Sequence, residues 1–475
     1  MTSSNKKGLQ AWQSWAIILA VSAGIYFFPW RPGDLRPEAL HMLAIFVGTI
    51  LGIILKPLPM GAVAMIGLAA SLVTDTVPSS EAFSGFSSKS VWLVVMAFFI
   101  SKAIIKSGLG QRMAYRFIQV FGKTTLGLTY ALLGVDLVLG SATPSSTARA
   151  GGVMAPIAQA LARSYDSYPH EASRKRIGAY LMNCLYHGDS IVAIFFLTAG
   201  ATKPLAQAIA ADFGIEITWM NWFLGALVPG AISLLIVPLA FLLLSPPELR
   251  ATPQAAQMAQ EELEAQGPLS RDEKWTGAIF VLALVLWITG SWHFLDATST
   301  AVLAVAFLLL TGVLSWQDIL GETGAWNTLS WFAVLMMMAE QLNSQGFIPW
   351  FSERVAGALA GYSWQWVFVA LCLLYFYSHY FFASLIAHVT AMYPAFLAVA
   401  LAAGAPPLYA ALMLAYVTNI CASTTHYASG PASIIFATGY VTQGEWWRNG
   451  AVMGVIYLLI WLGIGSLCFS LMGWL

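Results

Sequence analysis

Short runs of hydroxyl-bearing and small residues interrupt otherwise apolar stretches of this chain. Hydroxyl groups donate hydrogen bonds to anions, and a helix that begins beside them presents about half a positive charge. The candidates for such contacts are Ser145, Ser146, Thr147, Ser384, Thr425, His426 and Ser429. The residue types predict a site for a small anion.

Charged and helix-breaking residues accompany these runs. Arg149 stands inside an apolar segment, where an arginine costs about 2.5 to 3.5 kcal/mol on membrane-insertion scales and is usually paired or functional. Asp136 and Asp189 are possible partners. Two apolar segments, 177–205 and 414–440, have polar centres that predict broken helices, because Gly430-Pro431 cannot continue an undisturbed helix. The expected break positions are His187, Gly188, Asp189, Gly430 and Pro431.

The composition excludes a soluble globular protein. Apolar residues make up 59% of the 475 and charged residues only 9%, and several apolar runs are long enough to cross a bilayer. The first run, Ala11 to Phe28, could be a cleaved signal peptide. Because many equally apolar segments follow, we interpret it as an uncleaved membrane span. A net charge of zero gives no indication of a nucleic-acid partner.

Familiar enzyme and metal motifs are missing from the sequence. The four cysteines, Cys184, Cys372, Cys421 and Cys468, have no CxxC spacing, so neither a disulfide framework nor a zinc site is indicated. There is no Walker A loop, GxGxxG or HExxH motif. We therefore expect no metal and no cofactor, and a gradient rather than ATP as the energy source.

The chain repeats itself at an offset of about 239 residues. Gly85 matches Gly324, Trp92 matches Trp331, and His187 matches His426. Apolar segments 39–55, 60–74 and 91–107 match 278–291, 299–315 and 330–343. Each half continues with an interrupted pair, 124–163 or 363–400, that we expect to be a re-entrant helical hairpin. The broken helix comes next, and a last span, 219–245 or 449–473, closes each half.

This pattern predicts an all-α polytopic membrane protein of about 11 transmembrane helices. Counting each hairpin as re-entrant gives five crossings per repeat, and an odd number inverts the second copy. The expected divisions are 1–38 for the first span and its loop, 39–245 for repeat 1, 246–274 for a cytoplasmic linker with a short surface helix, and 275–475 for repeat 2. Of 22 lysines and arginines, with Arg149 set aside, 16 fall inside and 5 outside, Lys203 among the latter. The N-terminus is then cytoplasmic and the C-terminus external.

Paired interruptions at membrane depth indicate a secondary transporter. Irregular backbone in hydrocarbon leaves polar groups unsatisfied unless protein or a water-filled cavity serves them. Broken helices aim their positive ends at an anion near the midplane. A membrane-embedded enzyme using the histidines remains an alternative, as does a channel, although no spacing resembles a catalytic motif.

The run from Ala142 to Gly152 and the run from Thr425 to Ala432 resemble the divalent anion/sodium symporter family. The branch they are most similar to contains 2-oxoglutarate/malate translocators and citrate/succinate antiporters. The resemblance implies a homodimer in the inner membrane. It also implies a mobile domain that carries di- or tricarboxylates by an elevator movement past a fixed scaffold.

Sodium-coupled members of that family carry a Ser-Asn-Thr motif at each hairpin tip. Here the tips read Ser145-Ser146-Thr147 and Ser384-Leu385-Ile386, so neither asparagine is present. Arg149 and His388, which are 239 residues apart, take equivalent positions just beyond the tips. The resemblance implies that they act as fixed counter-charges in place of sodium. Exchange is then favoured over sodium symport, while a proton on the histidine leaves proton coupling open.

Overall fold

The computed structural model describes residues 11–28, 35–141, 143, 145–359 and 361–475. Its regular elements in those ranges are helices, with no β-strand among them. Lys6, Lys7 and Arg31, which enter the charge count above, lie outside the described residues.

Five helices open the chain, and four of them are apolar around their whole circumference. Such helices are buried in protein or in a membrane. Helix α4 lies against α14 and α16 from the second half of the chain. Helix α5 differs, since it is amphipathic. The bounds are α1 Ala11–Tyr26, α2 Pro37–Leu55, α3 Met60–Val73, α4 Lys89–Ser107 and α5 Leu109–Phe121.

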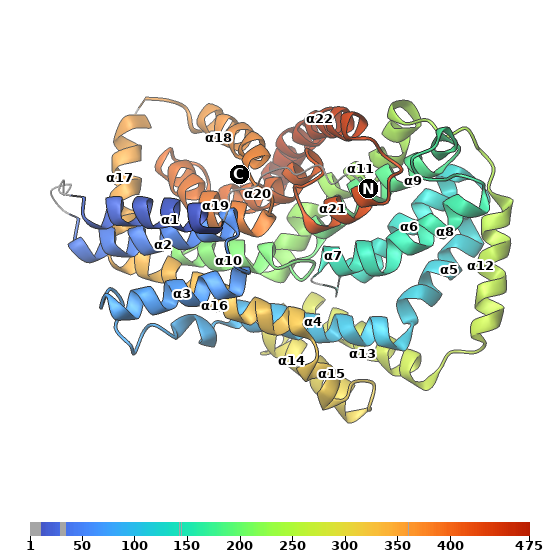
Figure 1. Ribbon diagram of the computed structural model, residues 1–475, viewed down its shortest axis with the longest axis horizontal. Coiled ribbons are helices and arrows are strands. Elements are labelled where there is room, and N and C mark those ends of the chain that lie inside the picture. Colours follow the sequence, from blue (N-terminus) through green and yellow to red (C-terminus); the bar gives the residue numbers. More distant parts are fainter. Residues whose placement is uncertain (1–10, 29–34, 142, 144, 360) are drawn as a thin grey trace.

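The same order returns in the second half. Two apolar helices are followed by a long buried one and then by α17, which begins 238 residues after α5 begins. In Figure 1, α3, α16 and α4 cross the lower part of the molecule, with α13 to α15 below them. The bounds are α13 Arg271–Ile288, α14 Ala297–Leu310, α15 Trp316–Leu320, α16 Thr323–Ser344 and α17 Phe347–Leu359.

Two interrupted helix pairs follow, where the sequence predicts hairpins. In the first, α6 (Thr125–Gly140) leads to α7 (Ser146–Arg149), a π-helical turn (Ala150–Met154) and α8 (Ala155–Ser164). In the second, α18 (Trp364–Ser378) and a 3-10 turn (His379–Phe381) lead to α19 (Leu385–Ala402). Ser145 accepts a hydrogen bond from the backbone N–H of Ala148, and Ser384 accepts one from Ala387. These N-caps, 239 residues apart, fix where each second helix begins.

The broken helix of the first half is interrupted later than predicted. Helix α9 runs unbroken over Gly178–Phe195, and the break covers 196–201 before α10 (Thr202–Asp212). The prediction of a break at His187, Gly188 and Asp189 is therefore wrong. All of α9 is buried in protein, so its polar groups find partners without a break. Gly188 also leaves space for the Leu133 side chain.

The second broken helix is interrupted where the sequence predicts. Helix α20 (Pro407–Ile420) passes through a 3-10 turn (Cys421–Ser423) into residues 424–429, and α21 (Gly430–Ala437) begins with Pro431 in its first turn. A proline fits there because its missing N–H has no helical acceptor. The two breaks are 228 residues apart. His187 lies inside α9 whereas His426 lies in the second break, so the predicted pairing of His187 with His426 is wrong.

The remaining helices close each half and connect the two. Helix α11 (Trp219–Leu244) ends the first half. The second half ends with α22 (Gln443–Leu459), a π-helical turn (Ile460–Gly465) and α23 (Ser466–Leu471). The surface helix expected in the linker is α12 (Pro253–Gln266). It packs on α5 at the right edge of Figure 1.

Five helices among the described residues are long and apolar enough to cross a membrane alone. They are Pro37–Leu55, Lys89–Ser107, Trp219–Leu244, Leu385–Ala402 and the continuous stretch Gln443–Leu471. The bent pair α17 and α18 brings the number to six. Further apolar helices, including α1, α3 and α6, have only 10–17 residues. The chain is thus all-helical with several spans.

Candidate functional site

Arg149 holds the first hairpin together from inside the protein. Its guanidinium donates to Asp136 on α6 (Nε to Oδ1, 2.5 Å) and to Asp189 on α9 (Nη2 to Oδ1, 2.6 Å). Nη1 donates to the carbonyl oxygen of Thr143 at 3.2 Å, within the interruption. Arg149 is 1% exposed, and charge-assisted bonds are stronger away from water. The side chain thereby fixes α6, α9 and the interruption relative to one another.

A second buried cation, Lys203, lies in the first turn of α10. Its side chain folds back over the break, because a Cβ built on Gly200 would stand 2.7 Å from Nζ. Its electrostatic neighbours are Arg149 and Asp189. The sequence-based topology counted Lys203, at the end of the broken span 177–205, among the external charges, whereas only 3% of it is exposed. Two buried cations and two buried carboxylates therefore share this end of the site.

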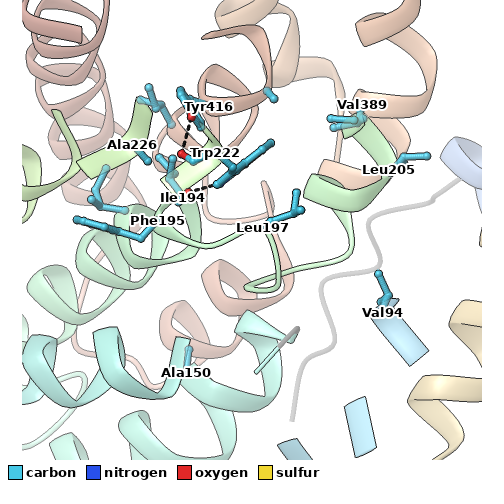
Figure 2. Packing of buried hydrophobic residues seen from close by; sticks show 14 of the residues in the cluster. Val94, Ala150, Ile194, Phe195, Leu197, Leu205, Trp222, Ala226, Val389 and Tyr416 are labelled. Carbon is cyan, nitrogen blue, oxygen red and sulfur yellow. Dashed lines mark hydrogen bonds between the residues drawn. The ribbon is translucent and has the colours of Figure 1, made fainter. Parts of the chain in front are cut away.

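Hydrogen bonds hold the first break against a neighbouring helix and the first hairpin. The Trp222 indole donates to the Ile194 carbonyl at 2.8 Å, and the Tyr416 hydroxyl donates to the Trp222 carbonyl at 2.7 Å (Figure 2). Thr198 donates from Oγ1 to the Ser141 carbonyl at 2.6 Å. Satisfying buried carbonyls in this way stabilises an opened helix inside a membrane.

The second break is stabilised in the same manner. The Tyr186 hydroxyl donates to the Ala422 carbonyl, and the Ser429 hydroxyl accepts from the Ala432 N–H at 3.3 Å. Helix α22 approaches the break closely at Gly450, where a Cβ would stand 2.4 Å from the Ser423 carbonyl oxygen. Only a residue without a side chain fits this contact.

A cluster without carboxylates lies at the second hairpin. His388 is 0% exposed, and its Nε2 lies 2.9 Å from the Ser378 hydroxyl. His379 contacts the Ala428 carbonyl through Nε2 at 3.1 Å, while its buried Nδ1 has no hydrogen-bond partner among the described residues. His379, His388 and Cys421 offer three ligand atoms within 4.8 Å of one another. Imidazole and thiolate ligands suit zinc or copper better than sodium.

The two halves meet through their interruptions. A Cβ on Gly430 would stand 2.2 Å from Thr147 Oγ1, so the first hairpin tip touches the start of α21. A Cβ on Gly151 would likewise meet Ile434 at 2.8 Å. In the complementary contact, α19 of the second hairpin packs on α10. Each hairpin therefore lies against the helix that follows the other half's break.

The expected site residues differ in their surroundings. Thr147 is exposed, whereas Ser145, Ser146 and Ser384 are half-buried. Thr425 is fully buried, and its Oγ1 has no partner among the described residues.

Two further residues, both histidines, were also expected positions. His426 is half-buried and accepts a hydrogen bond from the Trp447 indole at 3.1 Å. His187 faces away from the tips, with Nδ1 3.2 Å from the Tyr457 hydroxyl on α22.

A family model for the transmembrane region of sodium:sulfate symporters matches residues 9–475. The chain belongs to this family. YflS of Bacillus subtilis (strain 168), to which malate transport is attributed provisionally, is 48% identical over 96% of both chains. Chloroplastic dicarboxylate transporter 1 of Spinacia oleracea is 41% identical over 98% of this chain and 83% of its own length. The citrate/succinate antiporter of Escherichia coli (strain K12) is 36% identical over 94% and 95%.

Solved structures of distant membrane transporters share the fold. MtrF of Neisseria gonorrhoeae superposes with a TM-score of 0.60 at 13% identity, covering 97% of this chain and 94% of its own. YdaH of Alcanivorax borkumensis gives 0.54 at 12% identity, covering 86% and 89%. At these identities the likeness concerns the fold alone.

Sequence reasoning missed several residues that shape the site of this family member. Lys203 stands next to a proline in a short apolar helix, and only its place in the first turn after a break marks it. Trp222 and Gly450 contact the breaks from helices that carry no motif. These contacts depend on how distant helices pack, which no local pattern shows.

Proposed function

We propose that this protein is a secondary transporter of di- or tricarboxylate anions across the inner membrane. The observation that carries the proposal is the meeting of the two halves at their interruptions, where Thr147 touches Gly430. In this proposal, hydroxyls and helix starts from both halves surround the anion near this junction. The names of the relatives, which include malate, dicarboxylate and citrate/succinate transporters, supply the substrate class. A transporter needs no catalytic group, and none of the residues above is assigned one.

The substrate carboxylates are proposed to contact the tips and the second break. Helices α7, α19 and α21 each begin with a serine cap and direct their positive ends there. The Thr425 hydroxyl has no hydrogen-bond partner among the described residues, so it can bind the substrate. The proposed ligands are Ser145, Ser146, Thr147, Ser384, Thr425, His426 and Ser429.

Exchange is the proposed mode, with Arg149 and His388 as resident counter-charges. Arg149 cannot leave with the substrate, and it is ion-paired with Asp136 and Asp189. The proposal requires that the carrier crosses at a higher cost without a bound anion than with one. The carrier then returns most easily with another anion aboard, without sodium.

The remaining parts of the proposal concern the whole assembly. Two inverted repeats and about 11 crossings place the N-terminus inside and the C-terminus outside. The hairpins and broken helices move as a unit past the other helices, and the protein is a homodimer. An apolar cavity of about 210 Å³ between α2, α16 and α17 on one side and α10 and α19 on the other supports a sliding boundary.

Counterflow in proteoliposomes tests this function. Purified protein is reconstituted with labelled succinate inside, and malate, citrate or 2-oxoglutarate is added outside. We expect external anion to accelerate efflux of unaltered succinate, with equal rates in sodium and potassium buffers. Succinate accumulation on a sodium gradient without internal anion contradicts exchange.

Sodium or proton symport is the second candidate function. Membership in a family described by sodium:sulfate symport favours the sodium form, and the adjoining imidazoles of His379 and His388 favour the proton form. Accumulation driven by a pH gradient identifies proton coupling, since the vesicles then contain no exchangeable anion.

A further inference from the structure

Lys203 is a buried cation without a hydrogen-bond acceptor among the described residues. The residue as a whole is 3% exposed, but Nζ is not among the enclosed side-chain atoms that lack a partner. Its three donors therefore reach a small accessible space. Asp136 and Asp189 each accept a hydrogen bond from Arg149. Asp189 attracts the Lys203 ammonium electrostatically but accepts no hydrogen bond from it. An ionisable residue inside a membrane protein is by default a functional candidate.

The position of the ammonium indicates what it faces. The Lys203 side chain runs back along the break, with Nζ over Gly200. Helix α10 begins there without a side-chain cap on Ala201, so the positive end of its dipole adds to the lysine charge. Both features favour a negatively charged group in the first break.

We propose that Lys203 Nζ binds one carboxylate of the transported anion in the first break, while the hydroxyls near Thr147 and Gly430 bind the other. This inference rests on the proposed function and names a subsite within it. Arg149 lies near both places, since it belongs to the same short helix as Thr147 and its like charge repels that of Lys203. A bound anion would offset this repulsion. The proposed binding site thus has one cationic end and one hydroxyl-lined end, and each binds one carboxylate of a dianion.

The rival explanation gives Lys203 a structural role, in which it balances the charges of Asp136 and Asp189. A substrate comparison separates the two. Succinate and its monoamide, succinamate, have nearly the same shape but differ by one carboxylate. Loss of a carboxylate partner reduces the preference for succinate, whereas a loosened fold weakens both ligands alike.

The experiment measures calorimetric affinity for both ligands in detergent-solubilised full-length protein. The variants are Lys203→Met, Lys203→Arg and Gly200→Ala. Lys106→Met, which removes a lysine paired with Asp318 on another face, is the control. We expect Lys203→Met to reduce the preference for succinate by about 10- to 100-fold, in the range of a hydrogen bond between charged groups. Lys106→Met should leave it unchanged.

Two variants keep the test informative if Lys203→Met does not fold. Lys203→Arg retains the charge and should retain most of the preference. Gly200→Ala retains the lysine, but its new methyl group displaces the flexible end of that side chain and should lower the preference. An unchanged preference in Lys203→Met, or in Gly200→Ala when Lys203→Met cannot be purified, overturns the subsite and leaves the transport proposal intact. Failure of the wild-type protein to bind any di- or tricarboxylate overturns the proposed function itself.

Discussion

At the scale of single residues, the exposed hydroxyl of Thr147 offers the most direct test of the substrate site. Thr147→Val keeps the shape of the side chain but removes its donor, so we expect weaker succinate binding by about 0.5 to 3 kcal/mol. Affinity in detergent measures this, and Thr74→Val, at the exposed end of α3, is the control. Equal affinity in Thr147→Val, Ser145→Ala and Thr425→Val would place the site elsewhere.

Arg149 connects binding to stability. Arg149→Ala leaves two buried carboxylates without their partner, which costs about 3 to 5 kcal/mol of folding free energy, and it should abolish exchange. Thermal melting and counterflow check the two effects. Arg116→Ala removes an exposed arginine that is bonded to Gln119 in its own helix and should change neither. Full exchange by a stable Arg149→Ala protein is the result that contradicts this role.

At the scale of elements, the contact between α22 and the second break depends on one missing side chain. Gly450→Ala would bring a methyl group within 2.4 Å of one backbone carbonyl and 2.8 Å of the next, and backbone cannot yield as a side chain can. We expect a loss of about 1 to 3 kcal/mol and weaker substrate binding. Gly444→Ala, on the same helix with open space around it, is the matched control. Similar melting temperatures for both variants would contradict the close packing.

A second prediction at this scale concerns the cavity between α16 and α19. Ala391→Leu adds three carbons to its wall, so it should fill space that a sliding boundary uses. Exchange should slow severalfold while succinate affinity and melting temperature change little. Counterflow rates test this, with Ala358→Leu on the exposed face of α17 as control. Unchanged turnover in Ala391→Leu argues against movement across this boundary.

At the scale of the whole molecule, we predict a homodimer, which rests on the family resemblance. Mass measurement in mild detergent should give about twice the 51.3 kDa of one chain, after subtraction of bound detergent. Exchange by a protein that remains monomeric across the concentration range of the assay would contradict the prediction.

Local sequence signals located the interruptions that have strong helix breakers or serine caps. A capping hydroxyl or a proline marks a helix start in the sequence itself. This signal is present at Ser145, Ser384 and Gly430-Pro431. The break at 196–201 has no side-chain cap, and its nearest proline, Pro204, is the third residue of α10. Its Thr198 and Gly200 look ordinary, while the polar run around His187 suggested a break that packing renders unnecessary. A fixed offset of 239 also concealed the shorter spacing of the two breaks.

The partners of charged residues could be predicted only where few choices existed. Arg149 had Asp136 and Asp189 as the nearby acids, and the structure pairs it with both. Lys203 had no such signature, since its burial results from the packing of α10 against α4, α16 and α19. Counting charges on the two sides of the membrane treats every lysine as lying outside the bilayer, whereas Lys203 is buried in a helix.

The ion pairs of α4 can form only late in synthesis. Its ion pairs join Lys89 to Asp296, Lys102 to Glu322 and Lys106 to Asp318, and all three acids are made much later. Asp296 follows Lys89 by 207 residues, which takes about 10 to 40 seconds at common elongation rates of roughly 5 to 20 residues per second. During that interval α4 waits in the membrane without α14 and α16. A ribosome that stalls within this window leaves behind a first half with three unpaired lysines, a distinct target for membrane quality control.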